Sequence, residues 1–217
     1  MKKGLTEMVF ILDRSGSMSG MEADTIGGFN SMLEKQKKEE GDAILTTALF
    51  DNRYELIHDR FPIQSVQNMT EKEYYVRGST ALLDAMGSTI QKTINVQKHL
   101  PEKERAEKVI FVIITDGMEN SSCEYTYGDV QRMVEVQKEK GWEFMFLGAN
   151  IDAISEARKF GIPESRAVRY HSDAKGTAMN YDCVSEAICC MRSPESSEMG
   201  SQWKAEIENY RRKKEGK

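Results

Sequence analysis

The sequence predicts an α/β protein with a doubly wound, mostly parallel six-stranded sheet, one antiparallel edge strand and helices on both faces. Short apolar runs alternate with segments of helical periodicity along nearly the whole chain, which is the order of a βαβ architecture with right-handed crossovers. Two runs, Met8–Leu12 and Val109–Thr115, consist almost entirely of large apolar residues. Because strands covered on both faces are apolar on both, we expect these two to be neighbours at the centre of the sheet.

Four further strands complete the predicted sheet. Ala43–Phe50 and Tyr54–Ile63 are rich in β-forming residues and are joined only by Asp51-Asn52-Arg53, which is long enough for a hairpin but not for a crossover. We therefore expect these two strands to pair antiparallel at one edge. The other two predicted strands are Glu143–Gly148 and Ala167–Tyr170.

Segments with apolar residues at helical spacing lie between these strands. The predicted helices are Asp24–Lys38, Ala81–His99, Tyr127–Lys140, Ile151–Phe160 and Ala174–Met191. In the second of them, Leu82, Met86 and Ile90 recur every four residues, and Pro101 lies just beyond its end. Each helix is expected to bury one face against the sheet.

The end of the chain differs from the rest. Residues 1–192 are expected to form one domain, and residues 193–217 a linker and an amphipathic C-terminal helix with a basic end. The linker is expected at Ser193-Pro194-Glu195-Ser196-Ser197, the apolar face at Met199, Trp203, Ile207 and Tyr210, and the basic end at Arg211-Arg212-Lys213-Lys214. We expect this helix to dock on the domain, because its apolar face would otherwise need another protein to cover it. A partner-binding tail is the alternative.

Composition and charge restrict the class of protein. The 217 residues are 39% hydrophobic, which suits one α/β domain, and a net charge of −5 without a basic stripe argues against nucleic acid as a partner. No apolar stretch has the length needed to span a membrane, and the first strand begins too early to leave room for a secretory signal. The four cysteines have neither disulfide nor zinc spacing. We therefore expect a cytoplasmic protein with reduced thiols and no membrane partner.

Oxygen-bearing side chains follow the first central strand. Asp13, Ser15 and Ser17 come directly after Met8–Leu12 at alternating positions, and Gly16 allows a tight turn among them. Hard oxygen ligands without Cys or His suit Mg²⁺ or Mn²⁺ better than zinc. A second interpretation stays open at this point, because Ser-Gly-Ser is common in turns and an Asp at a strand end can cap the next helix.

This stretch resembles a known family. Asp13–Ser17 has the form Asp-x-Ser-x-Ser, the first element of the metal-ion-dependent adhesion site (MIDAS), and residues 5–192 resemble the von Willebrand factor type A (VWA) domains of the intracellular bacterial type. The family also has a Thr in a second loop and an Asp at the end of a later central strand. Here Arg77–Leu82 supplies Thr80, and Val109–Gly117 supplies Asp116.

The resemblance implies a complete metal site and a function. Asp13, Ser15, Ser17, Thr80 and Asp116 would hold Mg²⁺ or Mn²⁺, the two serines directly and the others directly or through water. An Asp or Glu carboxylate from a partner protein is the expected remaining ligand. We therefore expect a metal-dependent protein-binding module and not an enzyme. The resemblance also implies that such a module can be a subunit of a larger assembly.

A Mg²⁺-dependent phosphohydrolase is the alternative function, because an acid such as Asp13 at a strand end beside Mg²⁺ also begins the aspartyl-phosphate enzymes. Enzymes resembling haloacid dehalogenases need a second Asp two residues later, where this chain has Ser15. The chain also lacks a dinucleotide-binding glycine motif, a phosphate loop and a nucleophile elbow. Near the site, Arg14 and Arg77 are expected to be ordinary surface or packing residues, and Glu119 an exposed loop acid.

Overall fold

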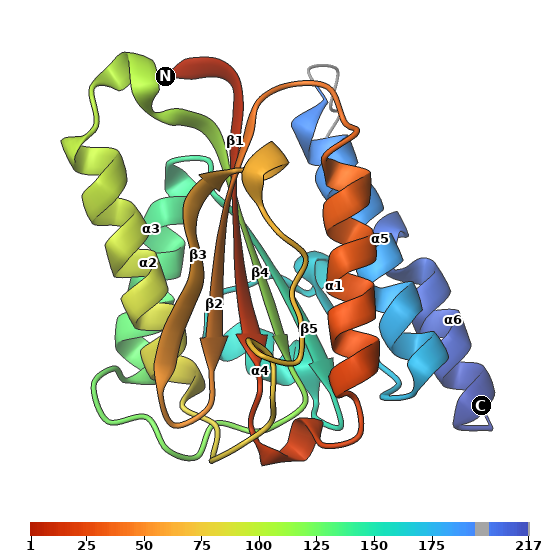
Figure 1. Ribbon diagram of the computed structural model, residues 1–217. Helices are drawn as coiled ribbons and strands as arrows, with labels where there is room; N and C mark the ends of the chain where they lie inside the picture. Colours follow the sequence, from red (N-terminus) through yellow and green to blue (C-terminus); the bar gives the residue numbers. More distant parts are fainter. Residues whose placement is uncertain (194–199, 217) are drawn as a thin grey trace.

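The computed structural model, which describes residues 1–193 and 200–216, contains a six-stranded sheet in the order β3-β2-β1-β4-β5-β6 (Figure 1). The strands are β1 (Lys2–Asp13), β2 (Ala43–Phe50), β3 (Tyr54–Pro62), β4 (Ala106–Thr115), β5 (Glu143–Ala149) and β6 (Ala167–Tyr170). All neighbouring pairs are parallel except β2 and β3, which form the antiparallel edge. The predicted edge hairpin and the predicted central pair, β1 and β4, are both confirmed.

Helices cover both faces of the sheet. They are α1 (Glu22–Gln36), α2 (Leu82–His99), α3 (Tyr127–Glu139), α4 (Ala153–Lys159), α5 (Ala174–Arg192) and α6 (Ala205–Lys214). One face packs against α2, α3 and α4, and the other against α1 and α5, with α6 on the outer side of α5 (Figure 1). The predicted fold class is therefore confirmed.

The side chains of β1 supply both hydrophobic cores. Met8, Phe10 and Leu12 pack on the side of α1 and α5, whereas Val9 and Ile11 pack on the side of α2, α3 and α4. All five are buried, as expected for a strand whose alternate residues face two helical layers. Because β1 pairs in parallel with β2 on one side and β4 on the other, its carboxyl end lies between the carboxyl ends of these two strands.

The polar start of β1 could not be recognised from its apolar pattern. The strand begins at Lys2, and Thr6 and Glu7 already pair with both neighbouring strands. Oε2 of the buried Glu7 carboxylate binds Arg60 and Gln97, which offsets part of the cost of losing water, whereas Oε1 has no hydrogen-bond partner. These partners are distant in sequence, so only the folded chain brings them together.

The C-terminal helix α6 packs against α5 and β6. Ile207 is only 2% exposed and belongs to the core on the α1 and α5 side. At the two ends of the contact, the Trp203 indole nitrogen donates to the carbonyl oxygen of Ser165 at 2.9 Å, and the Tyr210 hydroxyl donates to Asp173 at 2.9 Å. The expected apolar face is thus covered by the rest of the chain at these three positions.

Some of the C-terminal expectations cannot be compared with the structure. Most of the predicted linker, residues 194–197, and Met199 lie outside the described residues. Within the described part of the chain, no helix is long and apolar enough to cross a membrane.

Replacing Ile207 by Ala should lower the free energy of unfolding by about 2 kcal/mol. This is the low end for a buried Ile, because a helix near the chain end can relax around the lost methyl groups. Urea denaturation measures the difference. The matched control is Glu206→Ala, an exposed neighbour on the same helix, which should stay within about 0.5 kcal/mol of the parent protein. Equal stabilities for all three proteins would contradict a stabilising contact of α6.

Candidate metal centre

The carboxyl ends of β1 and β4 meet at one edge of the sheet, and the predicted metal ligands lie there. Asp13 is the last residue of β1, and Asp116 directly follows β4. Because these strands are parallel neighbours, their ends point to the same edge, as their arrowheads show in Figure 1. Thr80 lies two residues before the start of α2. The sheet therefore delivers residues from three distant segments to one region.

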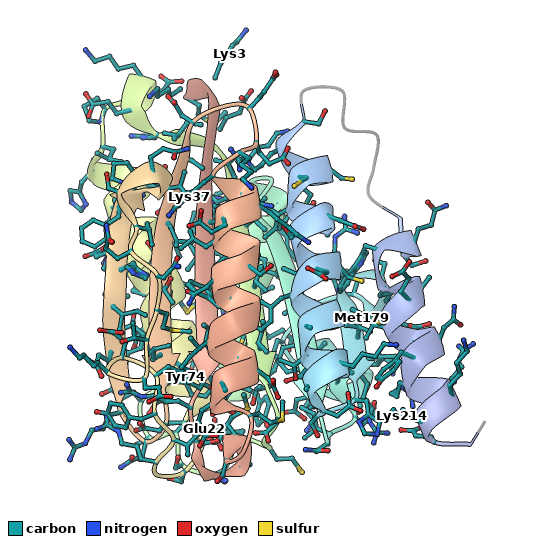
Figure 2. All side chains as sticks on the ribbon, turned by 45° about the vertical axis from the view of Figure 1, so that its right-hand side comes forward. Lys3, Glu22, Lys37, Tyr74, Met179 and Lys214 are labelled. Atoms are coloured by element: carbon teal, nitrogen blue, oxygen red, sulfur yellow. The ribbon has the colours of Figure 1, made fainter. Side chains whose placement is uncertain are left out.

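Asp13 is buried and held at both carboxylate oxygens. Its Oδ1 accepts a hydrogen bond from the main-chain nitrogen of Ser15 at 2.7 Å, and its Oδ2 accepts one from the Thr115 hydroxyl at 2.5 Å. Its carbonyl oxygen accepts from the buried Tyr74 hydroxyl at 2.6 Å. Figure 2 shows Tyr74 at the same end of the molecule as Glu22, the first residue of α1. These contacts fix the end of β1 in one orientation.

Asp116 is linked to the serines of the first loop. The Ser17 hydroxyl donates to Asp116 Oδ1 at 2.5 Å, and the Oγ atoms of Ser15 and Ser17 lie 3.1 Å apart. The second carboxylate oxygen of Asp116, Oδ2, is buried and has no hydrogen-bond partner. A buried carboxylate oxygen without a partner is costly, so this atom needs a positive or hydrogen-donating group.

Thr80 reaches the same region, and the position of Gly117 shows how close it comes. A Cβ added to Gly117 would lie 2.9 Å from Thr80 Oγ1 and 3.1 Å from Ser17 Oγ. The two hydroxyls therefore converge on the space beside a residue that has no side chain. The fold brings all five predicted ligands to one edge, with direct contacts among Asp13, Ser15, Ser17 and Asp116 and convergence of Thr80 on Ser17.

Burial raises the pKa of both carboxyl groups. The pKa of Asp13 rises to about 6 because of its burial, although hydrogen bonds from Thr115 and Ser15 act in the opposite direction. Burial likewise raises the pKa of Asp116, against the effect of the Ser17 hydrogen bond. Both shifts mean that burial disfavours the charged form of each carboxyl group. A divalent cation close to both carboxylates would stabilise their charged forms.

The donor set fits a small hard cation. It consists of two carboxylates and three hydroxyls, from Asp13, Asp116, Ser15, Ser17 and Thr80. Oxygen ligands of this kind suit Mg²⁺ or Mn²⁺. No group of three or more His, Cys, Asp or Glu side chains suited to a metal occurs among the described residues, so a metal here would depend on the hydroxyls. The partnerless Asp116 Oδ2 and the space beside Gly117 are the features of this chain that favour an ion.

Asn120 holds the main chain of Thr80 from both sides. Its Oδ1 accepts from the Thr80 nitrogen at 2.9 Å, and its own main-chain nitrogen donates to the Thr80 carbonyl oxygen at 3.0 Å. The loop after β4 thereby fixes the loop before α2. Nothing in the sequence marked Asn120, because one amide in a polar loop is ordinary.

Glu119 also has a structural role, which differs from the expectation of an exposed loop acid. It is partly buried, and its carboxylate accepts from the main-chain nitrogens of Leu83, Ser121 and Ser122 at 2.8 to 2.9 Å. Leu83 lies in the first turn of α2, where unpaired N–H groups favour a carboxylate. Glu119 therefore joins the loop after β4 to the start of α2.

Arg14 is fully buried, so the expectation of a surface residue is wrong and that of a packing residue holds. Its Nε donates to Asp51 at 3.1 Å, and its terminal nitrogens donate to Glu55 at 2.6 Å and to the Glu73 carbonyl oxygen at 3.1 Å. The Nε of Arg77 donates to the same Asp51 oxygen at 2.6 Å. The loop after β1 is thus anchored to the β2–β3 turn.

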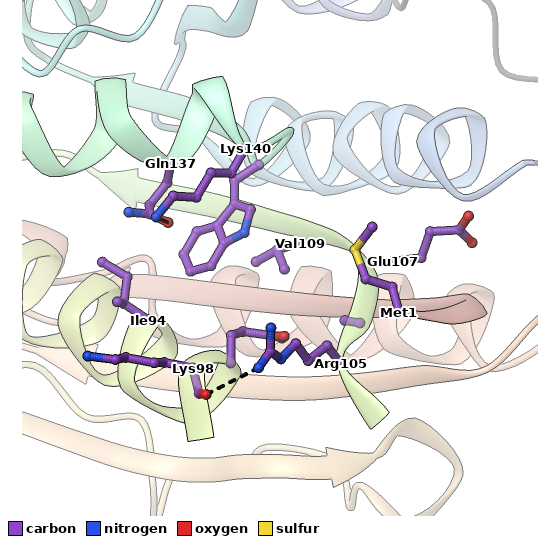
Figure 3. Close-up of a pocket in the computed structure, with 11 residues that line it drawn as sticks. Met1, Ile94, Lys98, Arg105, Glu107, Val109, Gln137 and Lys140 are labelled. Atoms are coloured by element: carbon purple, nitrogen blue, oxygen red, sulfur yellow. Dashed lines mark hydrogen bonds between the residues drawn. The ribbon is translucent and has the colours of Figure 1, made fainter. Parts of the chain in front are cut away.

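A separate cavity of about 380 Å³ lies at the other end of the sheet (Figure 3). Its walls include Ile94 and Lys98 of α2, Val109 near the start of β4, and Gln137 and Lys140 at the end of α3. The cavity lies near the amino end of β4, whereas the oxygen cluster lies at the carboxyl ends of β1 and β4. The two sites are therefore at opposite ends of the strands.

Comparison with solved structures identifies the fold. The vWF domain of the type V pili tip protein Mfa5 from Porphyromonas gingivalis is 10% identical with a TM-score of 0.60, and the match covers 88% of this chain and 97% of that one. The manganese-loaded TRAP protein of Plasmodium vivax is 16% identical with a TM-score of 0.59, covering 82% and 72%. The chain has the von Willebrand factor type A fold.

Other VWA structures match over a smaller part of their length. Proximal thread matrix protein 1 from the mussel byssus, in a structure with a zinc-occupied MIDAS motif, is 15% identical with a TM-score of 0.56. That match covers 85% of this chain but 46% of the mussel chain, so this chain spans about half of its length. A scan of protein-family models and a search of curated proteins gave no match.

Removing the Asn120 side chain should weaken metal binding without unfolding the protein. In Asn120→Ala, the Thr80 nitrogen loses its acceptor, and we expect Mg²⁺ affinity to fall about tenfold, the effect of roughly one hydrogen bond. Asn95→Ala, which removes an exposed amide that Gln91 bonds on α2, is the matched control and should leave the Mg²⁺ affinity unchanged. Isothermal titration calorimetry with Mg²⁺ measures the affinity, and thermal melting without metal tests the fold. Equal affinities for wild type and Asn120→Ala would show that Asn120 does not position Thr80.

Proposed function

We propose that the protein is a divalent-metal-dependent protein-binding module. In this function, Asp13, Ser15, Ser17, Thr80 and Asp116 hold Mg²⁺ or Mn²⁺ as a MIDAS, and an Asp or Glu side chain of a partner protein completes the coordination. The observation that carries the proposal is the cluster of carboxylate and hydroxyl oxygens from three loops, in which Ser17 contacts Asp116 Oδ1 while the buried Asp116 Oδ2 has no hydrogen-bond partner.

The number and charge of the donors favour an anionic partner. Mg²⁺ takes six oxygen ligands, and five side chains of this chain leave room for at least one more. Three of the five are neutral hydroxyls, so the ion keeps affinity for a negatively charged oxygen. Gly16 and Ser17 are exposed, which leaves the region open to another protein on this side.

The structural neighbours are compatible with this function. Zinc occupies the MIDAS motif in the mussel structure, and the Plasmodium protein is manganese-loaded. For this chain, the choice of Mg²⁺ or Mn²⁺, the acidic partner residue and membership of a larger assembly are parts of the proposal. So are a cytoplasmic location and the division into a binding domain of residues 1–192 and a C-terminal segment of residues 193–217.

The contacts of Asp13 argue against the alternative phosphohydrolase. A nucleophilic carboxylate needs an oxygen that can reach a phosphorus atom, but Asp13 is only 1% exposed, and Ser15 and Thr115 hold its carboxylate inside the protein. The residue two positions later, where an acid would be needed, is Ser15, whose hydroxyl lies against Ser17. We therefore propose a binding function and no enzymatic one.

Mg²⁺ should stabilise the wild-type protein against unfolding. An ion that binds only the folded state adds about 2.7 kcal/mol when its concentration is one hundred times the dissociation constant. Asp116→Ala should lose this gain, because it removes a charged ligand of the proposed ion from the loop after β4. Asp182→Ala, which removes an acid paired with Lys35 on the surface, is the matched control and should keep it. Urea denaturation with Mg²⁺ and with EDTA measures the gain; its absence from the wild type would contradict the metal site.

Partner capture should depend on the same ion. In pull-downs from a lysate of the source organism, we expect wild type to retain a partner in Mg²⁺ and to release it in EDTA, and Asp116→Ala to retain none. Adding Mg²⁺ back to the EDTA-treated sample should restore capture, which excludes irreversible damage. Identical capture in every sample would rule out a metal bridge. Mg²⁺-dependent phosphatase turnover that is lost in Asp13→Ala would instead favour the enzyme.

A further inference from the structure

Two exposed side chains lie on the loops that carry residues of the oxygen cluster, Met118 in the loop after β4 and Tyr75 in the loop before α2. Building on the function proposed above, we propose that they select the partner's sequence: the metal-binding Asp or Glu lies in an extended segment with a large apolar residue on at least one side. Met118 receives the apolar residue on one flank of the acid, and Tyr75 receives the one on the other.

Met118 is next to the space where the hydroxyls converge. It is 64% exposed and directly follows Gly117, whose missing Cβ would contact both Thr80 Oγ1 and Ser17 Oγ. Adjacent Cα atoms are about 3.8 Å apart, so the Met118 side chain starts within one residue of the site. A flexible thioether in this place can adapt to different apolar partners.

Tyr75 contacts the two arginines that link the loop after β1 to the end of β2. It is 42% exposed, and the guanidinium groups of Arg14 and Arg77 lie 5.2 and 5.1 Å from its ring centre. Its hydroxyl oxygen accepts a hydrogen bond from Arg77 at 3.0 Å. Both arginines bind Asp51, the residue that follows β2. Tyr75 is therefore a rigid aromatic surface on the β2 side.

The sheet order sets the spacing of these two contacts. β1 lies between β2 and β4, and neighbouring strands are about 4.8 Å apart, so the β2 and β4 flanks of the site are separated by about 10 Å. In an extended chain, the side chains that share a face with the acid are two residues away on either side, about 7 Å along the chain, which the long side chains of Tyr75 and Met118 can reach. One segment can therefore place an acid at the centre and a side chain on each flank.

The charges around Tyr75 argue for apolar rather than acidic neighbours of the bound acid. Arg14 and Arg77 are balanced by Asp51 and Glu55, with which they form ion pairs. These two arginines therefore add no excess positive charge that would favour a run of acidic residues. What the β2 flank offers to a partner is the ring of Tyr75.

The location of these residues is what distinguishes them from ordinary exposed side chains. The exposed large hydrophobic residues in the described part of the chain are Met1, Phe61, Tyr75, Met118 and Val136. Single exposed residues of this kind need no explanation, but two of these five lie on the loops that bring ligands to the proposed metal site. Tyr and Met are also the types enriched at protein interfaces.

A random octapeptide library displayed on phage tests the inference. The wild-type protein is immobilised in Mg²⁺, and bound phage are eluted with EDTA. We expect the eluted peptides to be enriched in Asp or Glu, with a large apolar residue within two positions of the acid. Enrichment of an acid without an apolar neighbour would overturn the inference and leave the proposed function intact. Failure to enrich any acid would contradict the proposed function itself.

Variants assign the preference to its residues. On Met118→Ser the apolar preference on one flank should disappear, and on Tyr75→Ser the preference on the other flank. The best wild-type peptide, synthesised and titrated in Mg²⁺, should bind each variant about tenfold more weakly, the loss of one apolar contact. Val136→Ser removes an exposed apolar residue from α3 and is the matched control, with affinity equal to wild type. Unchanged peptide selection and affinity in both site variants would overturn the roles of Met118 and Tyr75.

Discussion

The parallel pairing of β1 with β4 imposes the main constraint on this structure. Because both strands end at the same edge, Asp13 and Asp116 come to lie in one buried region, and the cost of burying both charges raises the pKa of each. The contacts of Thr115, Ser15 and Ser17 offset only part of this cost. The fold therefore buries two carboxyl groups whose charged forms are unfavourable at this edge. A divalent cation is the simplest group that would stabilise both charges.

The loops around this edge hold one another in place through their main chains. Gly16 donates to the carbonyl oxygen of Gly78 at 3.1 Å, and Asn120 bonds to the main chain of Thr80 in both directions. Gly78 has a φ of 68°, and a Cβ there would lie 2.4 Å from the Asn52 side chain, so this position needs glycine. An arrangement fixed in this way presents its oxygens without a large rearrangement, which lowers the entropic cost of binding.

The parts of the molecule that could be predicted from the sequence are those with local patterns. The apolar runs Met8–Leu12 and Val109–Thr115 predicted the two central strands. The alternation of oxygen-bearing residues after the first run indicated that Asp13, Ser15 and Ser17 lie close together. The roles of Arg14 and Asn120 could not be predicted, because their partners are distant in sequence and neither residue type is unusual in a polar loop. Local periodicity determines the elements, whereas the contacts between loops depend on the folded topology.

The buried Arg14 lies between two proposed ligands in sequence, and its energetics indicate why an arginine is useful there. A buried ion pair such as Arg14 with Asp51 gives little net stability, because desolvation of both charges offsets their attraction. Its planar guanidinium, however, donates in fixed directions to three segments, so the loop from Asp13 to Ser17 has one preferred orientation. A lysine could not make these directed contacts simultaneously. The ion pair is therefore better explained by positioning of the loop from Asp13 to Ser17 than by stability.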